Sequence, residues 1–294
     1  MSVNTQELLD AGCHFGHLKR KWNPKMAPYI FMERNGIHII DLNKTSAKLD
    51  EAVAAIKQIA KSGKRVLFVA TKKQAKDIVA NAAKSVNMPY ITERWPGGML
   101  TNFATQRKSV KKMTGFDKFM KDETFNNISK KERLQVSRQK AKMEKLIGSI
   151  ADLTRLPAAL FIVDILKEHI AVSEAQKLGI PTIAICDTNT DPTNIDFPIP
   201  ANDDATKSIA LIMNEMVKAI EEGISERKMD KEADRERDAA ADEEAGERGE
   251  EGEEKMLVVA DAEDDGEEKT GAPAKKATGR PRKTTAGTRK AKDE

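Results

Sequence analysis

Two uninterrupted apolar runs, ALFIVD at residues 159–164 and GIPTIAICD at residues 179–187, decide the fold class. Both are apolar throughout, a pattern typical of parallel strands that are covered on both faces. A helical pattern over about residues 167–178 separates them, which predicts a strand, a helix and a second parallel strand. The short run at 196–200 contains two prolines and predicts an edge strand, where proline is tolerated.

The same alternation of strand and helix extends in both directions from these runs. The other predicted elements are a helix at 4–11, a β-hairpin with its turn at Asn35-Gly36, a helix at 45–62, a strand at 65–71, a helix at 73–86, a strand at 89–92 and a final helix at 203–222. Together they predict an α/β fold with a doubly wound, flavodoxin-like parallel sheet.

The stretch ERWPGGMLTN, residues 93–102, ends the strand pattern and begins a basic helical segment; we call it the elbow. Its proline ends regular pairing, and its two glycines permit backbone conformations that a side chain would forbid. Arg94 beside Trp95 suits contact with a phosphate backbone. The alternative is a glycine turn with a tryptophan in the core.

Residues 101–150 predict an antiparallel helical hairpin inserted into the α/β body. Ser129 and Glu132 have the spacing of a capping box, which predicts where the second helix begins. Residues 105–146 carry 13 Lys and Arg but only 5 Asp and Glu, more cations than a helical face needs for solubility. Upstream, residues 13–26 predict a loop in which aromatic and basic residues alternate, and such a loop can stack on bases while neutralising phosphates.

The net charge of +3 conceals three regions. Residues 1–222 carry +9, residues 223–268 carry −13 and residues 269–294 carry +7. A basic folded part is typical of a nucleic-acid-binding protein. The predicted domains are an α/β RNA-binding body at 1–100 and 151–222, a basic helical hairpin at 101–150, an acidic disordered linker at 223–268 and a basic disordered tail at 269–294.

Several classes of protein are disfavoured. No apolar run reaches the length of a membrane span, the polar start MSVNTQELLD does not look like a signal peptide, and two cysteines are too few for a disulfide framework, so we expect a cytoplasmic protein. The strand at 65–71 is not followed by a glycine-rich phosphate loop, and a GxSxG motif is lacking. We therefore expect neither an enzyme nor a small-molecule substrate.

One low-ranking candidate metal site combines His17 with Asp187, Asp203 and Asp204, provided that the N-terminal loop folds over the end of a strand. Imidazole and carboxylate groups are ligands for Zn²⁺ or Mg²⁺. The alternative is an Asx-rich turn with helix capping and a histidine that contacts RNA. No other feature calls for a cofactor.

The chain resembles the bacterial family of small-subunit ribosomal protein number two, on seven ordered segments between residues 6 and about 222: AGCHFGHLKRKWNPKMAPYIF, HIIDLNKT, VLFVATKK, RWPGGMLTN, LPAALFIVD, LGIPTIAICDTNTDP and IPANDDA. The resemblance implies a doubly wound parallel sheet with an inserted helical hairpin. It also implies a structural role, in which the protein binds small-subunit rRNA between head and body and helps dock the large mRNA-binding ribosomal protein.

The resemblance further implies which residues face RNA. They are Lys19, Arg20, Lys21, Trp22, Asn23, Lys25, Arg94, Trp95, Thr101, Asn102, Arg107, Lys108, Lys111 and Lys112. The chain departs from the family after Glu222, and we expect its basic end to contact rRNA or a neighbouring protein, with the acidic stretch as a spacer. A Gly-Arg-Pro core at 279–281 resembles an AT-hook, so the alternative function is nucleic-acid binding outside the ribosome, to DNA through this tail.

Overall fold

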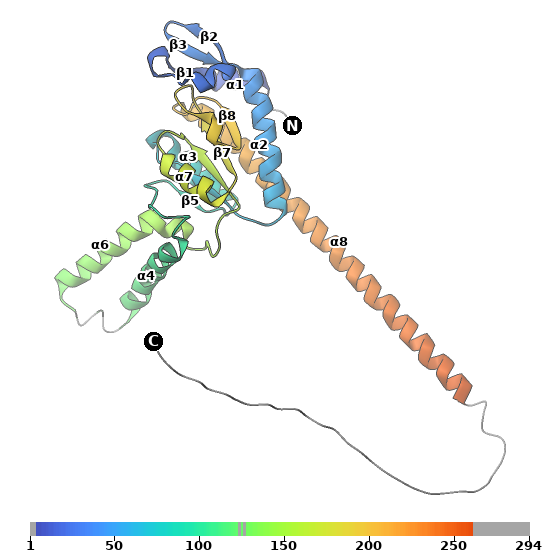
Figure 1. Cartoon of the computed structure of the whole chain (residues 1–294). Helices are drawn as coiled ribbons and strands as arrows, with labels where there is room; N and C mark the ends of the chain where they lie inside the picture. Colours follow the sequence, from blue (N-terminus) through green and yellow to red (C-terminus); the bar gives the residue numbers. More distant parts are fainter. Residues whose placement is uncertain (1–3, 123–124, 126–127, 261–294) are drawn as a thin grey trace, which may run out of the picture. The chain divides into compact units, whose positions relative to one another are not determined.

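The computed structural model describes residues 4–122, 125 and 128–260. The chain divides into two units, residues 1–235 and 236–294, and the first unit contains both sheets (Figure 1). Its parallel sheet has the order β5-β4-β6-β7-β8, which is the 2-1-3-4-5 order of flavodoxin-like folds and confirms the predicted α/β class. The strands are β4 (Val66–Val69), β5 (Tyr90–Ile91), β6 (Ala159–Val163), β7 (Thr182–Cys186) and β8 (Phe197–Pro200).

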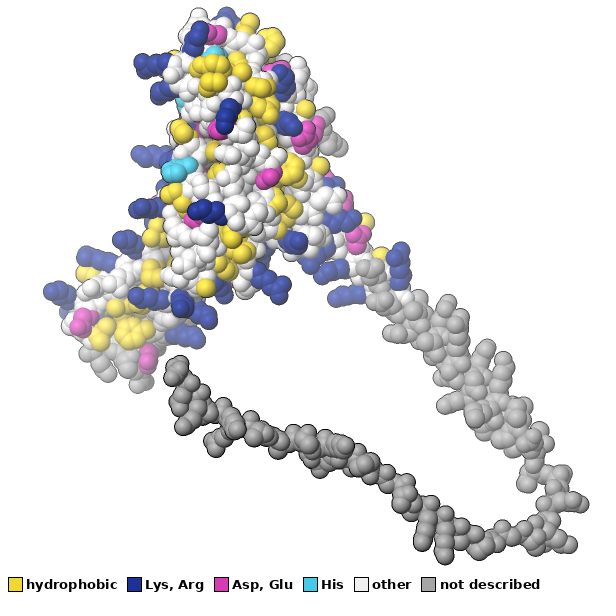
Figure 2. Space-filling model, viewed as in Figure 1, with side chains coloured by type: hydrophobic (Ala, Val, Ile, Leu, Met, Phe, Trp, Pro, Cys, Tyr) yellow, Lys and Arg dark blue, Asp and Glu magenta, His cyan; other side chains and the backbone are white. Residues whose placement is uncertain are grey.

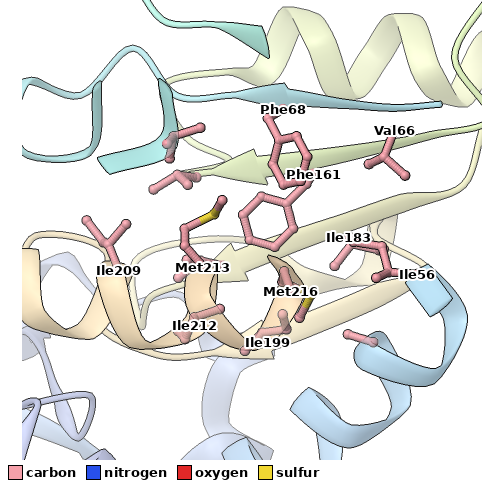
Figure 3. Packing of buried hydrophobic residues seen from close by; sticks show 14 of the residues in the cluster. Ile56, Val66, Phe68, Phe161, Ile183, Ile199, Ile209, Ile212, Met213 and Met216 are labelled. Carbon is pink, nitrogen blue, oxygen red and sulfur yellow. The ribbon is translucent and has the colours of Figure 1, made fainter. Parts of the chain in front are cut away.

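Both faces of this sheet are buried, because alternate residues of each strand enter different hydrophobic clusters. On one face the rings of Phe68 and Phe161 lie 5.4 Å apart and pack against Met213 and Met216 (Figure 3). The helices on this face are α2 (Leu42–Lys61), α3 (Lys73–Ser85) and α8 (Thr206–Ala260). The other face packs against α7 (His169–Leu178), the elbow and the base of the hairpin.

The predicted helical hairpin is present as α4 (Phe103–Lys121) and α6 (Lys130–Ile147), which contact each other. The capping box is confirmed: the Ser129 hydroxyl accepts from the Glu132 amide at 3.3 Å, and the Ser129 amide donates to the Glu132 carboxylate at 3.3 Å. Val110, Met113 and Ile147 are buried in the same cluster as the sheet. The base of the hairpin is therefore part of the core.

The predicted β-hairpin is confirmed by β2 (Ile30–Arg34) and β3 (Ile37–Ile40), whose turn residues Asn35 and Gly36 have φ values of 53° and 73°. The prediction of a loop over residues 13–26 is partly wrong. This segment contains a strand, β1 (Phe15–Leu18), which pairs with β3 and completes a three-stranded antiparallel sheet. It follows helix α1 (Thr5–Asp10). The pairing of β1 is irregular, and its residues are exposed or half-buried with none fully buried, which explains why the sequence shows no alternating pattern here.

The last helix is longer than predicted. Disordered chain was expected from residue 223, but α8 continues to Ala260. Just beyond the predicted end, Gly223 packs closely against α2, where a Cβ would lie 2.6 Å from the Lys57 carbonyl. Lys57 also forms ion pairs with Glu222 and Glu226 at 2.9 Å. Within the described residues no helix, α8 included, combines the length and apolarity that crossing a membrane requires. The rest of the predicted linker, 261–268, and the tail with its AT-hook-like segment lie outside the described residues.

Candidate nucleic-acid interface

A single buried carboxylate holds the elbow. Glu174, which is 6% exposed, lies on the covered side of α7. It accepts hydrogen bonds from Trp95 Nε1 at 3.1 Å and from the backbone N–H groups of Gly98, Leu100 and Thr101 at 2.9, 2.9 and 3.1 Å. Burial alone would raise the pKa of Glu174, but these hydrogen bonds outweigh it and lower the pKa. The elbow amides thus surround an anion that the protein itself supplies.

Trp95 faces the core and not the solvent. Its side chain is 6% exposed and packs in the cluster that contains Met99, while its indole N–H is used by Glu174. Of the two alternatives for this ring, the structure shows core packing, and an exposure of 6% leaves little of the ring for contact with RNA. The neighbouring Arg94 is exposed and remains available to an external anion.

The hairpin cations divide into two groups. Arg107 Nη1 donates to the carbonyls of Ala151 at 3.1 Å and Leu153 at 2.8 Å, so its guanidinium fastens α4 to the segment after α6. By contrast, three lysines are exposed and form no ion pair within the described part of the chain: Lys108, Lys111 and Lys112. Figure 2 shows Lys and Arg side chains over the hairpin, with few acidic ones among them.

The predicted elbow residues Thr101 and Asn102 differ in what they can do. The Thr101 hydroxyl donates to Glu174 at 3.2 Å, so part of its bonding capacity is internal. Asn102 is exposed and precedes α4, where its side chain makes no capping bond. Of the two side chains, that of Asn102 therefore keeps more of its hydrogen-bonding capacity for an external ligand.

The N-terminal basic group is fixed to the loop after β7. Asn23 donates its amide to the Thr188 carbonyl at 2.8 Å, and Lys25 pairs with Asp191 at 2.7 Å. Six predicted residues lie here, and all except the half-buried Asn23 are exposed: Lys19, Arg20, Lys21, Trp22, Asn23 and Lys25. The Trp22 ring, 37% exposed, lies 5.2 Å from that of His38. The loop after β7, to which this group is bonded, and the elbow after β5 both lie at carboxyl ends of parallel strands, the edge at which such sheets bind ligands.

The structure brings the four predicted metal ligands together at this edge. His17 Nδ1 lies 2.7 Å from Asp187 Oδ2, and His17 Nε2 lies 3.6 Å from Asp204 Oδ2. His17, Asp187 and Asp203 each offer a ligand atom, all within 4.8 Å of one another. Asp203 is fully buried, and its Oδ2 has no hydrogen-bond partner among the described residues. The expected folding of the N-terminal loop over the strand end is confirmed.

Lys72 already supplies one cation to this cluster. Its Nζ lies 2.7 Å from Asp203, 2.8 Å from Asp204 and 3.1 Å from Asp164. Burial alone would lower the pKa of Lys72, but its hydrogen bonds to Asp203 and Asp204 outweigh this and raise the pKa. Burial and the charge of Asp187 raise the pKa of Asp203 to about 7, and the hydrogen bond to Asp187 raises the pKa of His17.

Two residues that organise the site, Glu174 and Lys72, were missed by sequence reasoning. A signal for Glu174 existed, because it lies between Val172 and Ala175 on the apolar stripe of its helix, where a charge requires partners. Lys72 lies three residues after the end of β4, in the turn where a phosphate-binding loop would have been recognised by its glycines. Its carboxylate partners are distant in sequence, so nothing local identified them.

Comparison with known proteins shows the family of this chain. A family model described as ribosomal protein S2 matches residues 8–223. The chain belongs to the ribosomal protein S2 family. It is 70% identical over 229 residues to "Small ribosomal subunit protein uS2" of Phocaeicola vulgatus, covering 78% of this chain and 82% of the relative. The protein of the same name from Cytophaga hutchinsonii is 66% identical, covering 78% and 90%.

Membership of the S2 family confirms the predicted class. The chain is a structural component of the small ribosomal subunit and not an enzyme. The cations and carboxylates at the edge of the sheet are accordingly interpreted as groups that bind and position, and not as catalytic groups.

We predict that Glu174→Gln lowers the free energy of unfolding of this S2-family chain by about 2–3 kcal/mol, because several buried N–H groups lose a charged acceptor. Chemical denaturation monitored by tryptophan fluorescence measures this. A carboxyl whose pKa is lowered on folding stabilises the native state above its unfolded pKa of about 4.3, and this contribution is lost as pH falls through the folded pKa. The difference between wild type and variant must therefore shrink in acid, while the exposed control Glu221→Gln changes little at any pH.

Lys72→Met is expected to destabilise this S2-family chain by about 3 kcal/mol near neutral pH, because a buried carboxylate cluster loses its cation. The loss is larger at pH 8 than at pH 5, since Asp203, whose pKa is about 7, is ionised only at the higher pH. Lys73→Met, which removes the exposed neighbour, is the matched control. Equal effects of the two substitutions in thermal unfolding would contradict a specific role for Lys72.

Proposed function

We propose that this chain binds small-subunit rRNA through the exposed cations at the carboxyl edge of its sheet and on its hairpin. The supporting observation is that Arg94, Lys108, Lys111 and Lys112 are exposed on a segment that Glu174 and Arg107 fasten to the core. Cations on a fixed scaffold can match phosphate spacing without losing much freedom on binding. The exposed Trp22 adds a ring on which a base can stack.

The proposal places the chain between the head and the body of the small subunit, in the cytoplasm, where it helps dock the large mRNA-binding ribosomal protein. An exposed apolar surface on the three-stranded sheet supports a protein partner. Phe15, Phe31 and Met32 are 51%, 69% and 48% exposed there, beside a groove of about 650 Å³. Exposed apolar side chains of this size favour contact with another protein over contact with RNA.

A bound divalent ion is the second part of the proposal. His17, Asp187 and Asp203 would hold it, with Asp204 as a further ligand, and Zn²⁺ suits this mixture of imidazole and carboxylate better than Mg²⁺ does. The buried, unpartnered Oδ2 of Asp203 supports the fit. The ion would tie the N-terminal loop to the ends of β7 and β8 and would have no catalytic task.

Arg94→Ala combined with Lys108→Ala is expected to weaken incorporation into small subunits and to reduce the slope of log K against log salt by about 2, because about one counterion is released per phosphate contact. Binding to purified subunits at several salt concentrations measures this. The matched control, Lys177→Ala with Lys207→Ala, removes two other exposed cations. Equal slopes for the two double variants would contradict the assignment of the elbow and hairpin.

Metal analysis of the purified chain tests the ion. We expect about one Zn²⁺ per chain in the wild type and its loss in His17→Ala, because the imidazole is the only nitrogen ligand of the cluster. His169→Ala, which removes an exposed histidine elsewhere, should retain the metal. Absence of metal from both the wild type and His169→Ala would refute the proposed site.

A further inference from the structure

A second basic surface lies at the opposite, amino edge of the parallel sheet. It is a groove of about 760 Å³ between the end of α2 and the segments that lead into β4, β6 and β7. The rim cations Lys64, Arg65 and Arg155 are exposed. Apolar side chains also line the groove, among them Ile59, Leu156 and Pro181. We call it the amino-edge groove.

The cations of this groove differ from their neighbours on α2. Lys57 and Lys61 are neutralised by Glu222, Glu226 and Asp230 of α8. Lys64, Arg65 and Arg155 have no ion-pair partner in the part of the chain that the structure describes, and no acidic residue lines the groove. Around the end of α2, the cations without an acidic partner among the described residues are therefore those of the groove.

A fourth cation reaches the same place from α8. The guanidinium of Arg227 lies against Gly63, in the space that a Cβ would need. Gly63 has a φ of +73° and lines the groove, so a side chain is excluded there both by the backbone conformation and by Arg227. The groove and α8 are thus fitted to each other, and Arg227 adds positive charge beside the three rim cations.

The apolar residues of the groove decide between two kinds of ligand. Leu156 is 45% exposed, whereas Leu153 beneath it is buried. Covering an aliphatic surface is favourable for a ligand that brings apolar side chains of its own. RNA brings none, and no aromatic ring lines the groove to stack on a base. The combination of cationic rim and aliphatic floor matches an acidic peptide that also carries Leu, Ile or Val.

We propose that the amino-edge groove binds an acidic segment of another protein, with carboxylates on Lys64, Arg65 and Arg155 and an aliphatic side chain against Leu156. The site is separate from the carboxyl edge and from the hairpin. A protein docked there leaves the proposed rRNA-binding cations free, so one chain can bind both partners at once.

Fluorescence anisotropy with the full-length chain tests this, using a short labelled peptide of repeated Glu-Glu-Leu-Leu as the probe. We expect Lys64→Glu with Arg155→Glu to weaken binding about tenfold, because two exposed attractions become repulsions. Lys177→Glu with Lys207→Glu makes the same charge change elsewhere and should leave binding unchanged. A second probe with Ser in place of each Leu should bind about tenfold more weakly, since it cannot cover the aliphatic floor.

Other outcomes overturn the proposal. Equal binding of the Leu and Ser probes would mean that the peptide is held by charge alone and that the aliphatic floor contributes nothing. Binding of an oligouridylate that is lost in the groove variant, without binding of the peptide, assigns the groove to RNA. Crosslinks from Lys64 to the chain's own residues 236–268, without peptide binding, indicate that the ligand is internal. A wild-type dimer that is lost in the groove variant indicates that the groove binds a second copy of the chain.

Discussion

A parallel sheet whose strands are apolar on both faces must be covered on both faces, and the rest of the structure follows from this requirement. On one face α2, α3 and α8 supply the cover. On the other, α7 is too short to cover the whole surface, and the elbow with the base of the hairpin completes it. The basic hairpin is therefore not an appendage on a linker. The base of the hairpin is part of the core. This packing fixes the direction in which the cationic side chains of the hairpin project from the α/β body.

One buried charge, that of Glu174, and one half-buried charge, that of Lys72, connect this packing to the surface chemistry. Glu174 is tolerated in the core because five donors surround it, and those donors belong to the elbow. Lys72 is tolerated because it lies among Asp164, Asp203 and Asp204, which come from different strand ends. In each case the cost of desolvating a charge is offset only if distant segments meet in one geometry. Glu174 and Lys72 thus each favour a single arrangement of the segments that meet at the carboxyl edge of the sheet.

The sequence could predict what periodicity and turn chemistry encode. The buried runs before Asp164 and Asp187, the Asn35-Gly36 turn and the Ser129 capping box all appear where expected. Strand β1 was missed because it is short, irregular in pairing and exposed, so that it is defined by its partner and not by its own pattern. The helical residues just after 223 were missed for a related reason. Glu226 and Asp230 pair with Lys57 and Lys61 of another helix, and composition does not report such pairs.

The cations of the folded part that are bonded internally must be separated from the unpaired ones before its positive charge can be interpreted as a binding surface. Some cations are used internally, as Arg107 is by backbone carbonyls and Lys140 is by Asp117 at 2.5 Å. Others, such as Lys108 and Arg155, have no such partner within the described residues. Counting charges treats these groups alike, although a cation already neutralised by a carboxylate gains little from a phosphate. Two groups of unpaired cations lie far apart in the fold, one on the hairpin and the carboxyl edge of the sheet and one at its amino edge. A single basic protein can therefore present surfaces of different chemistry, one with an exposed ring and exposed lysines and one with an aliphatic floor.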